Sequence, residues 1–461
     1  MKSENKVAVL NIASTVILQG IAFFTTPIFT RMLGTEQYGL YSVFFFRLDI
    51  LISFFGLGLV SSLGTSLHKY KDEYYQYRSS TLLLTTIIAF GFILIANIAI
   101  YPIKTLLGYD LLLTECLLFL ALFYTVINFA QTAFIFEKKA ATNFIMSLFL
   151  AVVSVGLSML LISSIGGERR YVGRVLGQFI TYFATALFIW FFLFLKKPSC
   201  IKKEYAKYGL VYGIPVIFHL LAHSLLSQSD REMMIRLNIS NDEIGVYSFF
   251  CVLTSVLTVL LNALSNSWSP FYYDAIEENK IDKLNVMCKN VIELFTVLSI
   301  GFLLLSKEVG IWISTKDFWR GTKVIPILII SSYFIFLYQF PVCFEFYNKK
   351  TKIIAIGTVI SALSNILLNI FMIPLWGMYG AAITTAISYF ILFLIHYIFV
   401  NIYTKGEYHL KIHYFVPGFV VLLLFVLVFY ILLDYALIRW GLGAIIGIIE
   451  LYRIYKRKTI F

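Results

Sequence analysis

The chain has 461 residues, of which 60% are hydrophobic and only 13% charged, and its formal net charge is +12. Soluble domains are about 45–50% apolar and about 25% charged, so this composition excludes an ordinary water-soluble protein and predicts an all-α, polytopic membrane protein. The lysines and arginines lie in short segments between apolar runs, as is typical of membrane topology, and we expect no nucleic-acid partner.

A transmembrane helix needs about 20 mainly apolar residues, and roughly fourteen such runs follow one another along the chain. The first six are expected at about 8–30, 38–66, 80–101, 111–135, 142–164 and 172–195. The next six are expected at about 208–237, 243–268, 286–306, 322–345, 351–373 and 378–401. A final pair is expected at about 414–433 and 436–452.

Two pairs of similar segments indicate that the chain is built from related halves. The stretch RMLGTEQYGLYS (Arg31–Ser42) resembles RLNISNDEIGVYS (Arg236–Ser248), and Ile165–Phe179 resembles Ile373–Phe390 in its glycine and tyrosine at a tight turn. Internal repeats of this kind are typical of membrane transporters. We predict an N-terminal lobe over 1–200, a C-terminal lobe over 201–405, and two further helices over 406–461.

The basic segments predict the orientation of the chain. If both termini are cytoplasmic, about twice as many lysines and arginines face inward as outward, as the positive-inside rule expects. The cluster KKPSCIKKEYAK (Lys196–Lys207) is the longest strongly basic loop and the expected joint between the halves. A topology signal is the favoured interpretation of this loop, with binding of anionic lipid as the alternative.

No motif for covalent chemistry accompanies the apolar runs. The sequence has no GxxxxGKS, HExxH or GxSxG pattern, and its five cysteines are scattered without CxxC spacing. We therefore expect no catalytic residues, no metal and no cofactor.

Arg47 is expected in the middle third of the second run, where a charged side chain needs a partner or water. Asp49 projects to the opposite side of the same helix and is not a same-face partner. One hypothesis places Arg47 in a cavity that receives a phosphate or sugar. The other gives it a structural ion pair with a neighbouring helix.

The seventh run carries polar groups on two faces. His219, His223 and Asp230 share one face, and Ser224, Gln228 and Arg231 share the other. We expect one face to line a cavity and the other to contact a helix. Proton coupling through His223 or Asp230 is one alternative, and capping by Asp230 and Arg231 is another.

The fourth run has a stripe of uncharged polar side chains that includes Asn128 and Gln131. These groups suit sugar hydroxyls, although hydrogen bonds between helices are an equal alternative. The complete set of predicted cavity residues is Arg47, Asn128, Gln131, His223, Gln228, Asp230 and Arg231.

The RMLGTEQYGLYS turn, the YGIP…SDRE…IRLN…IGVYS segment and the IPLWGMYGAA turn, with fourteen runs, resemble one known family. It comprises the Wzx-type O-antigen or capsular repeat-unit flippases of the multidrug/oligosaccharidyl-lipid/polysaccharide (MOP) superfamily. The resemblance implies two six-helix lobes around a central cavity, as in the MATE fold, plus two C-terminal helices. It also implies location in the bacterial cytoplasmic (inner) membrane.

The implied function is to turn undecaprenyl-pyrophosphate-linked oligosaccharide from the inner to the outer leaflet by alternating access, without enzymatic chemistry. The implied partners are this lipid-linked substrate, the bilayer, and a polysaccharide polymerase with its chain-length regulator. One alternative is a cation-coupled multidrug exporter of the same superfamily. A less favoured one is an O-antigen polymerase or ligase, which would need a long outer loop that the sequence lacks.

Overall fold

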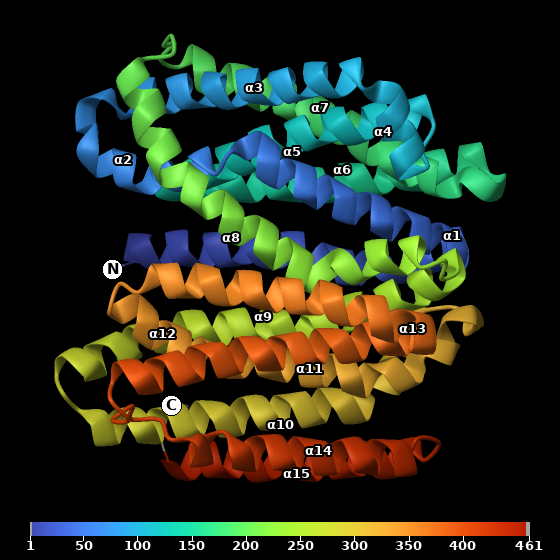
Figure 1. The fold of residues 1–461 in the computed structure, drawn as a ribbon, viewed down its shortest axis with the longest axis vertical. Helices are drawn as coiled ribbons and strands as arrows, with labels where there is room; N and C mark the ends of the chain where they lie inside the picture. The colour runs from blue at the N-terminus through green and yellow to red at the C-terminus, as the bar shows by residue number, and fades with distance from the viewer. Residues whose placement is uncertain (1, 458–461) are drawn as a thin grey trace. The chain divides into compact units, whose positions relative to one another are not determined.

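The computed structural model describes the backbone of residues 2–457 and the side chains of residues 23–457 (Figure 1). Over these residues the backbone forms helices and connecting turns, with no strand, which confirms the all-α prediction. The chain divides into two compact units, Met1–Arg231 and Glu232–Phe461. The division falls inside a helix rather than in the basic loop at 196–207, and the lobe limits expected at residues 200 and 405 stay predictions.

The first unit is built from eight α-helices, and most of the eighth belongs to it. They are α1 (Lys2–Gly56), α2 (Leu63–Lys69), α3 (Tyr74–Ile98), α4 (Ile100–Leu107), α5 (Leu111–Phe136), α6 (Ala140–Ile165), α7 (Arg170–Leu195) and α8 (Lys203–Arg236). Helix α7 packs mainly on α6 and α5, and α1 packs on the same two helices.

The second unit continues the pattern of long antiparallel helices. They are α9 (Asn241–Glu277), α10 (Ile281–Ile313), α11 (Ile325–Leu337), α12 (Gln339–Tyr347), α13 (Thr351–Tyr403), α14 (Val416–Ile431) and α15 (Ala436–Arg457). Helix α11 packs on α13, and α10 packs on α15, α14 and α9.

The two longest helices are each interrupted by one glycine. Gly34 has φ 72° and ψ −178° within α1, and Gly377 has φ 54° and ψ −129° within α13. Positive φ favours glycine because it has no Cβ, and the ribbons of α1 and α13 each reverse direction within their length (Figure 1). Each long helix is therefore two membrane-length segments joined by a tight turn.

The predicted fourteen segments correspond to the observed helices. The correspondence requires dividing α1 and α13 at their glycines, joining α11 to α12, and setting aside the short α2 and α4. Among the described side chains, eleven helices are long and apolar enough to cross a membrane, and α13 alone supplies two predicted segments. The first predicted run, at 8–30, lies mostly outside the described side chains.

The repeated sequence motifs make the same hydrogen bond in both units. In the first unit, the Gln37 side-chain oxygen accepts from the backbone N–H of Tyr171 at 3.3 Å, near the start of α7. In the second, Glu243 Oε1 accepts from the backbone N–H of Met378 at 2.7 Å, directly after the turn in α13. Gln37 and Glu243 occupy matching places in the two motifs. In both units the bond gives an acceptor to a backbone N–H in the first turn of a helix, which has no partner within that helix.

Small residues let α6 and α7 approach each other closely. A Cβ added at Gly173 would lie 2.6 Å from the Ile162 nitrogen, and one added at Gly177 would lie 2.5 Å from the Ser158 nitrogen. These two glycines are four residues apart, the spacing through which membrane helices bring their backbones into contact. The pair explains why α6 and α7 form the most extensive helix contact in the first unit.

Each unit also holds a buried ionisable pair. Arg78, fully buried on α3, lies 2.6 Å from Glu137, and its other amino group donates to the Leu193 carbonyl. In the second unit, Nδ1 of His396 lies 2.9 Å from both carboxylate oxygens of Glu345, and both side chains are buried. Buried charges are rarely found without such partners.

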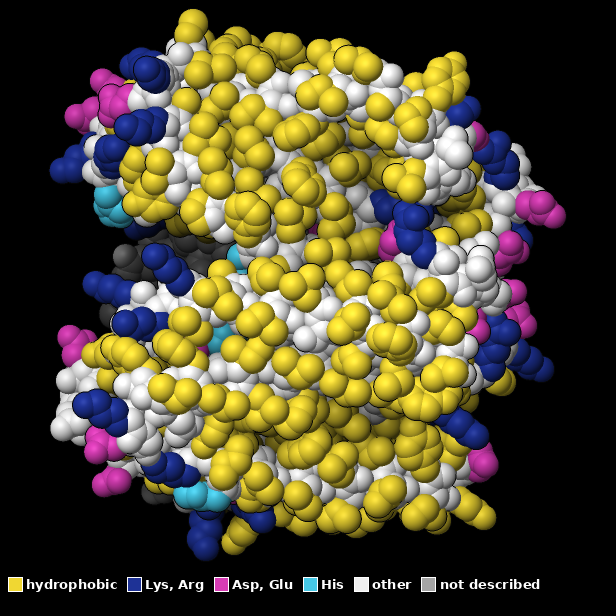
Figure 2. Space-filling model, viewed as in Figure 1, with side chains coloured by type: hydrophobic (Ala, Val, Ile, Leu, Met, Phe, Trp, Pro, Cys, Tyr) yellow, Lys and Arg dark blue, Asp and Glu magenta, His cyan; other side chains and the backbone are white. Residues whose placement is uncertain are grey.

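The outer surface of each unit is apolar across the middle of its helices. In Figure 2, hydrophobic side chains cover most of the visible face, while Lys, Arg, Asp and Glu gather near the helix ends. Exposed apolar residues include Ile98 at 88% and Leu437 at 80%. A surface of this kind suits a lipid environment.

Candidate functional site: a polar pocket in the first unit

A cavity of about 380 Å³ lies within the first unit, among α1, α3, α5 and α8. Its lining is unusual for a membrane-embedded bundle because most of the residues that line it are polar. They are Asp49, Ser53, Thr85, Thr125, Asn128, His223, Ser224, Ser227 and Gln228, with Ile52, Val60, Phe129, Leu220 and two glycines between them. Convergent polar groups in an otherwise apolar pocket are the usual mark of a binding site.

The carboxylate of Asp49 is the only acidic group among the lining residues. Its Oδ2 accepts a hydrogen bond from Ser224 Oγ at 2.6 Å and a longer one from Gln228 Nε2 at 3.3 Å. Both donors lie on α8, one turn apart, so they present the same face to α1. Asp49 thus joins α8 to α1 through neutral donors, and no ion pair to it occurs among the described residues.

A carboxylate in the middle of a membrane span is costly, by about 2.5–3.5 kcal/mol on insertion scales. Two neutral hydrogen bonds offset part of that cost, and a cation or a set of hydroxyl donors would offset more. The arrangement can therefore bind polyhydroxylated or cationic groups.

Glycines at the pocket floor allow α8 to approach the end of α1. Leu57 and Gly58 have φ values of 42° and 59°, which turn the chain sharply after α1. A Cβ added at Gly213 of α8 would lie 2.3 Å from the Leu57 carbonyl oxygen. The two backbones are therefore in contact on this side of the cavity.

Three of the predicted cavity residues line this pocket. Asn128 comes from α5, and His223 and Gln228 come from α8. Gln131, one turn beyond Asn128, instead turns toward α6, where its Nε2 lies 3.4 Å from Ser147 Oγ. That contact matches the alternative of a hydrogen bond between helices.

Arg47 lies outside the 380 Å³ pocket. Its Nη1 donates to the Leu107 carbonyl at 2.6 Å, and its guanidinium lies 4.8 Å from the centre of the Tyr109 ring. Arg47 is not among the residues that line the 380 Å³ pocket. These contacts hold Arg47 at the C-terminal end of α4, where the free carbonyls attract a cation.

Asp230 and Arg231 are both buried near the end of α8. Asp230 Oδ1 accepts from the backbone N–H of Arg231 at 2.9 Å, and it lies 3.8 Å from the Arg231 guanidinium. Neither residue lines the pocket. Their assignment to the substrate path, like that of Arg47 and Gln131, stays a prediction.

Asp49 lines the pocket but is absent from the predicted cavity residues. The sequence predicts only that it projects away from Arg47 on the same helix, which agrees with the separate positions of the two side chains. The available signal was the pair Ser224 and Gln228, which share a face of the seventh run and present the donors that a carboxylate needs. Sequence alone does not say which helix that face meets.

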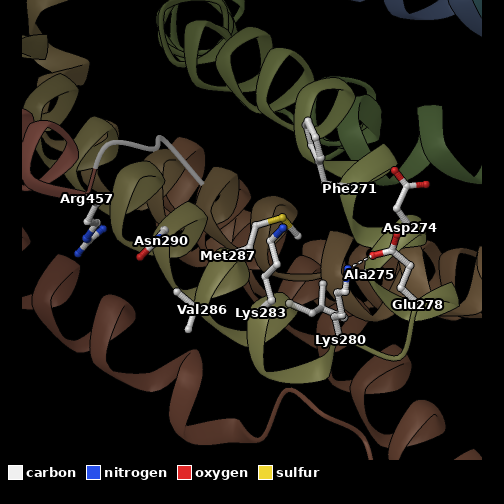
Figure 3. Close-up of a pocket in the computed structure, with 11 residues that line it drawn as sticks. Phe271, Asp274, Ala275, Glu278, Lys280, Lys283, Val286, Met287, Asn290 and Arg457 are labelled. Atoms are coloured by element: carbon white, nitrogen blue, oxygen red, sulfur yellow. Dashed lines mark ion pairs between the residues drawn. The ribbon is translucent and has the colours of Figure 1, made fainter.

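The second unit has a larger pocket, of about 800 Å³, near the ends of α9 and α10 (Figure 3). Asp274 and Glu278 reach it from the end of α9, and Lys283 reaches it from α10. Lys280 lies 2.7 Å from Glu278, drawn as a dashed line in Figure 3. Charges of both signs at helix ends are typical of the water-facing rim of a membrane protein, so we do not place the functional site here.

Comparison with known proteins identifies the family. The model for the family described as "Polysaccharide biosynthesis protein" matches residues 6–274, which is more than half of the chain. The chain belongs to this polysaccharide biosynthesis protein family. It is also similar to the "Lsg locus putative protein 1" of Haemophilus influenzae, with 24% identity over 392 residues, covering 80% of this chain and 93% of that protein.

Solved structures show that this family member has the fold of MOP superfamily transporters. The lipid II flippase MurJ, in an inward closed conformation, matches with a TM-score of 0.72 and 17% identity over 97% of this chain and 99% of that chain. An inward-facing multidrug resistance MATE family transporter of the MOP superfamily matches with a TM-score of 0.67 and 16% identity, covering 86% of this chain and all of that one. The predicted multi-pass, MATE-like architecture is confirmed.

Proposed function

We propose that this family member moves the polar head of a lipid-linked oligosaccharide across the bacterial cytoplasmic membrane. The observation that carries the proposal is the pocket around Asp49, which offers hydroxyl, amide and carboxylate groups inside a bundle with an apolar surface. A sugar head group cannot enter hydrocarbon without losing its hydrogen bonds to water. Polar side chains in the pocket replace those bonds during transfer.

The substrate we propose is an undecaprenyl-pyrophosphate-linked repeat unit that passes from the inner to the outer leaflet by alternating access. Membership of a polysaccharide biosynthesis family supports a sugar substrate, and the fold shared with a lipid II flippase and a MATE transporter supports transport. The polyprenyl tail remains in lipid, because nothing favours its removal. No bond is made or broken, so the protein needs no catalytic residue. Both termini would be cytoplasmic, and coupling to a polymerase and chain-length regulator belongs to the same proposal.

The experiment is deletion of the gene in its host, followed by measurement of surface polysaccharide and of lipid-linked repeat units in the membrane. We expect deletion to abolish the polysaccharide and to cause repeat units to accumulate. Wild-type protein should restore both, and Asp49→Ala should not. Asp434→Asn is the matched control, because that carboxylate is 85% exposed and pairs with Lys307 outside the pocket. Normal polysaccharide after deletion would exclude the proposed substrate.

One observation favours a second candidate, a cation-coupled multidrug exporter. Asp49 is a membrane-embedded carboxylate with neutral hydrogen-bond donors, which is also a suitable arrangement for holding a proton or a monovalent cation. The same deletion strain distinguishes the two functions. An exporter predicts greater sensitivity to cationic dyes with unchanged surface polysaccharide, and the flippase predicts the reverse.

A further inference from the structure

Another pocket lies within the second unit, among α10, α14 and α15. Helix α10 packs on both α14 and α15, and residues from all three helices line a space of about 660 Å³. Ligand pockets usually have volumes of about 300–1,000 Å³. Two of the lining residues, Val421 and Ile449, are exposed, so the pocket opens on the apolar outer surface of the unit. We call it the α15 pocket.

The lining of the α15 pocket is charged at one end and apolar over the rest. Its titratable groups are Lys289 and Glu293 from α10, His413 from the turn before α14, and Glu450 and Arg453 from α15. Its apolar groups include Val297, Ile300, Val421, Phe425, Ile446 and Ile449. Along α10 alone, Ile300 lies about 16 Å beyond Lys289. A phospholipid has the same division into a polar head and apolar chains.

Glu450 is the group in this pocket that lacks hydrogen-bond donors. It is only 3% exposed, and neither of its carboxylate oxygens accepts a hydrogen bond from the described part of the chain. Nη1 of Arg453, one turn further along α15, lies 3.8 Å from Oε2, which is too far for a hydrogen bond. Buried carboxylates in proteins are normally satisfied by donors. A ligand of the α15 pocket that brings N–H groups to Glu450 would supply them.

The charged residues around Glu450 define the ligand further. Glu293 is already satisfied, because its Oε2 accepts from the Arg457 guanidinium at 2.5 Å. Lys289 and Arg453 are both exposed at the charged end of the pocket. A ligand that fits this end carries both signs of charge, with a cationic donor for Glu450 and an anionic group for the two cations. A purely anionic head would instead place a second negative charge beside Glu450.

We infer that the α15 pocket binds phosphatidylethanolamine, a membrane phospholipid whose head carries a primary ammonium and a phosphate. The N–H groups of the ammonium donate to the two oxygens of Glu450, and hydrogen bonds between charged groups are the strong ones. The phosphate lies beside Lys289 and Arg453, as lipid head groups do in basic pockets between membrane helices. The acyl chains follow the apolar part of the pocket. The bound lipid joins α10, α14 and α15, and this role does not depend on which substrate the protein moves.

The test is native mass spectrometry of the full-length protein in detergent, with dioleoyl lipids that differ only in the amine of the head. The lipids are phosphatidylethanolamine, its N-methyl and N,N-dimethyl derivatives, and phosphatidylcholine, so that each step removes one N–H donor. We expect the Kd to rise along the series. Phosphatidylcholine should bind at least about tenfold more weakly than phosphatidylethanolamine, because its trimethylammonium group cannot donate to Glu450.

Variants assign the preference to this pocket. Glu450→Gln keeps the shape of the side chain without its charge, and it should weaken binding of phosphatidylethanolamine by about tenfold while leaving phosphatidylcholine unchanged. Lys289→Gln combined with Arg453→Gln removes the partners of the phosphate and should weaken both lipids alike. Asp434→Asn is the matched control and should bind as the wild type does, because that carboxylate is 85% exposed and pairs with Lys307 outside the pocket.

Equal affinity of the wild type for phosphatidylethanolamine and phosphatidylcholine would overturn the inference, as would an undiminished preference in Glu450→Gln. A matching loss of preference in Asp434→Asn would also overturn it, since the effect would then be one of general charge. Displacement of bound phosphatidylethanolamine by farnesyl phosphate would show that the pocket takes a polyprenyl lipid instead. Thermal unfolding checks that each variant is folded. If Glu450→Gln is not, the lipid series with the wild type and with the double variant of exposed residues decides the outcome.

Discussion

Asp49 and Ser224 form the shortest hydrogen bond between α1 and α8 among the pocket residues, at 2.6 Å. Ser227 lines the same pocket, but its hydroxyl donates to the carbonyl of His223 on its own helix. The two serines therefore differ in whether they stabilise a charge on another helix. A hydrogen bond to a charged group is worth about 1.5–3 kcal/mol, and a neutral one about half of that.

We expect Ser224→Ala to lower the stability of the protein by about 1–3 kcal/mol, because a half-buried carboxylate loses its best donor. Ser227→Ala should change it by less than about 0.5 kcal/mol. Thermal unfolding in detergent, followed by intrinsic fluorescence, measures both. Equal effects of the two substitutions would mean that the bond to Asp49 does not hold α8 in place.

Arg78 is a different case, because its charge is compensated inside the protein. It is fully buried between Glu137 and the Leu193 carbonyl, so it joins α3 to the end of α5 and to α7. Breaking a buried ion pair costs about 3–5 kcal/mol, and without Arg78 the buried Glu137 keeps only the partly exposed Lys139 as a partner.

Arg78→Met is therefore expected to reduce the amount of folded protein in the membrane severely. The double substitution Arg78→Met with Glu137→Gln should recover much of the loss, since residue 137, left with Lys139 as its one charged partner, is then neutral. Quantifying the membrane-inserted, monodisperse protein for each variant tests this. A double variant as poor as the single one would show that packing, and not charge, sets the cost.

At the scale of helices, the sequence predicted those features that depend only on the residues of one segment, such as its length and its ends. Apolar run length predicted the membrane helices, and the repeated turn motifs predicted that Gly34 and Gly377 end one segment and begin the next. The partner of each polar face was not predictable, because the rotation of α8 against α1 depends on packing that a single helix does not encode. For this reason the predicted cavity residues omit Asp49, which lines the pocket, and include Gln131 and Arg47, which lie away from it.

The contact of α8 with the end of α1 depends on Gly213. A Cβ at this position would meet the Leu57 carbonyl oxygen at 2.3 Å, where the atom belongs to the backbone and cannot rotate away. Gly213→Ala should therefore displace α8, lower the unfolding temperature and impair transport.

The control is Gly156→Ala on α6, where nothing lies within 4 Å of an added Cβ. Alanine is favoured over glycine within a helix by about 1 kcal/mol, so Gly156→Ala should be neutral or stabilising. Limited proteolysis of the loop at 196–202 measures whether α8 has moved. Identical cleavage of Gly213→Ala and wild type would contradict the assigned contact.

At the scale of the whole molecule, the connection between α13 and α14 makes the free energy of unfolding depend on pH. His409 Nδ1 lies 2.9 Å from Asn285 Oδ1, and its Nε2 lies 3.1 Å from the Tyr272 hydroxyl. In the neutral ring, one nitrogen donates and the other accepts, so both bonds are satisfied. Burial lowers the pKa of His409 from 6.5 to about 4.

Folding favours the neutral form of His409. The contribution of His409 to the free energy of unfolding is therefore fully present above pH 6.5 and is lost as the pH falls from there toward 4. The full loss over this pH range amounts to about 3 kcal/mol. We expect the unfolding temperature of the wild type to fall between pH 7 and pH 5 more steeply than that of His409→Gln, which cannot take up the proton. Parallel curves for the two proteins would exclude His409 as the titrating group.

The proposed function requires that polar groups within an apolar bundle carry a head group through the membrane. The most direct measurement uses proteoliposomes that contain a fluorescent short-chain oligosaccharide diphosphate lipid, with the fraction exposed outside followed by chemical quenching. We expect the protein to equilibrate the lipid between leaflets within minutes, and Asp49→Ala to act no faster than protein-free vesicles. Equal rates with and without the wild-type protein, or an unchanged rate in Asp49→Ala, would contradict the account.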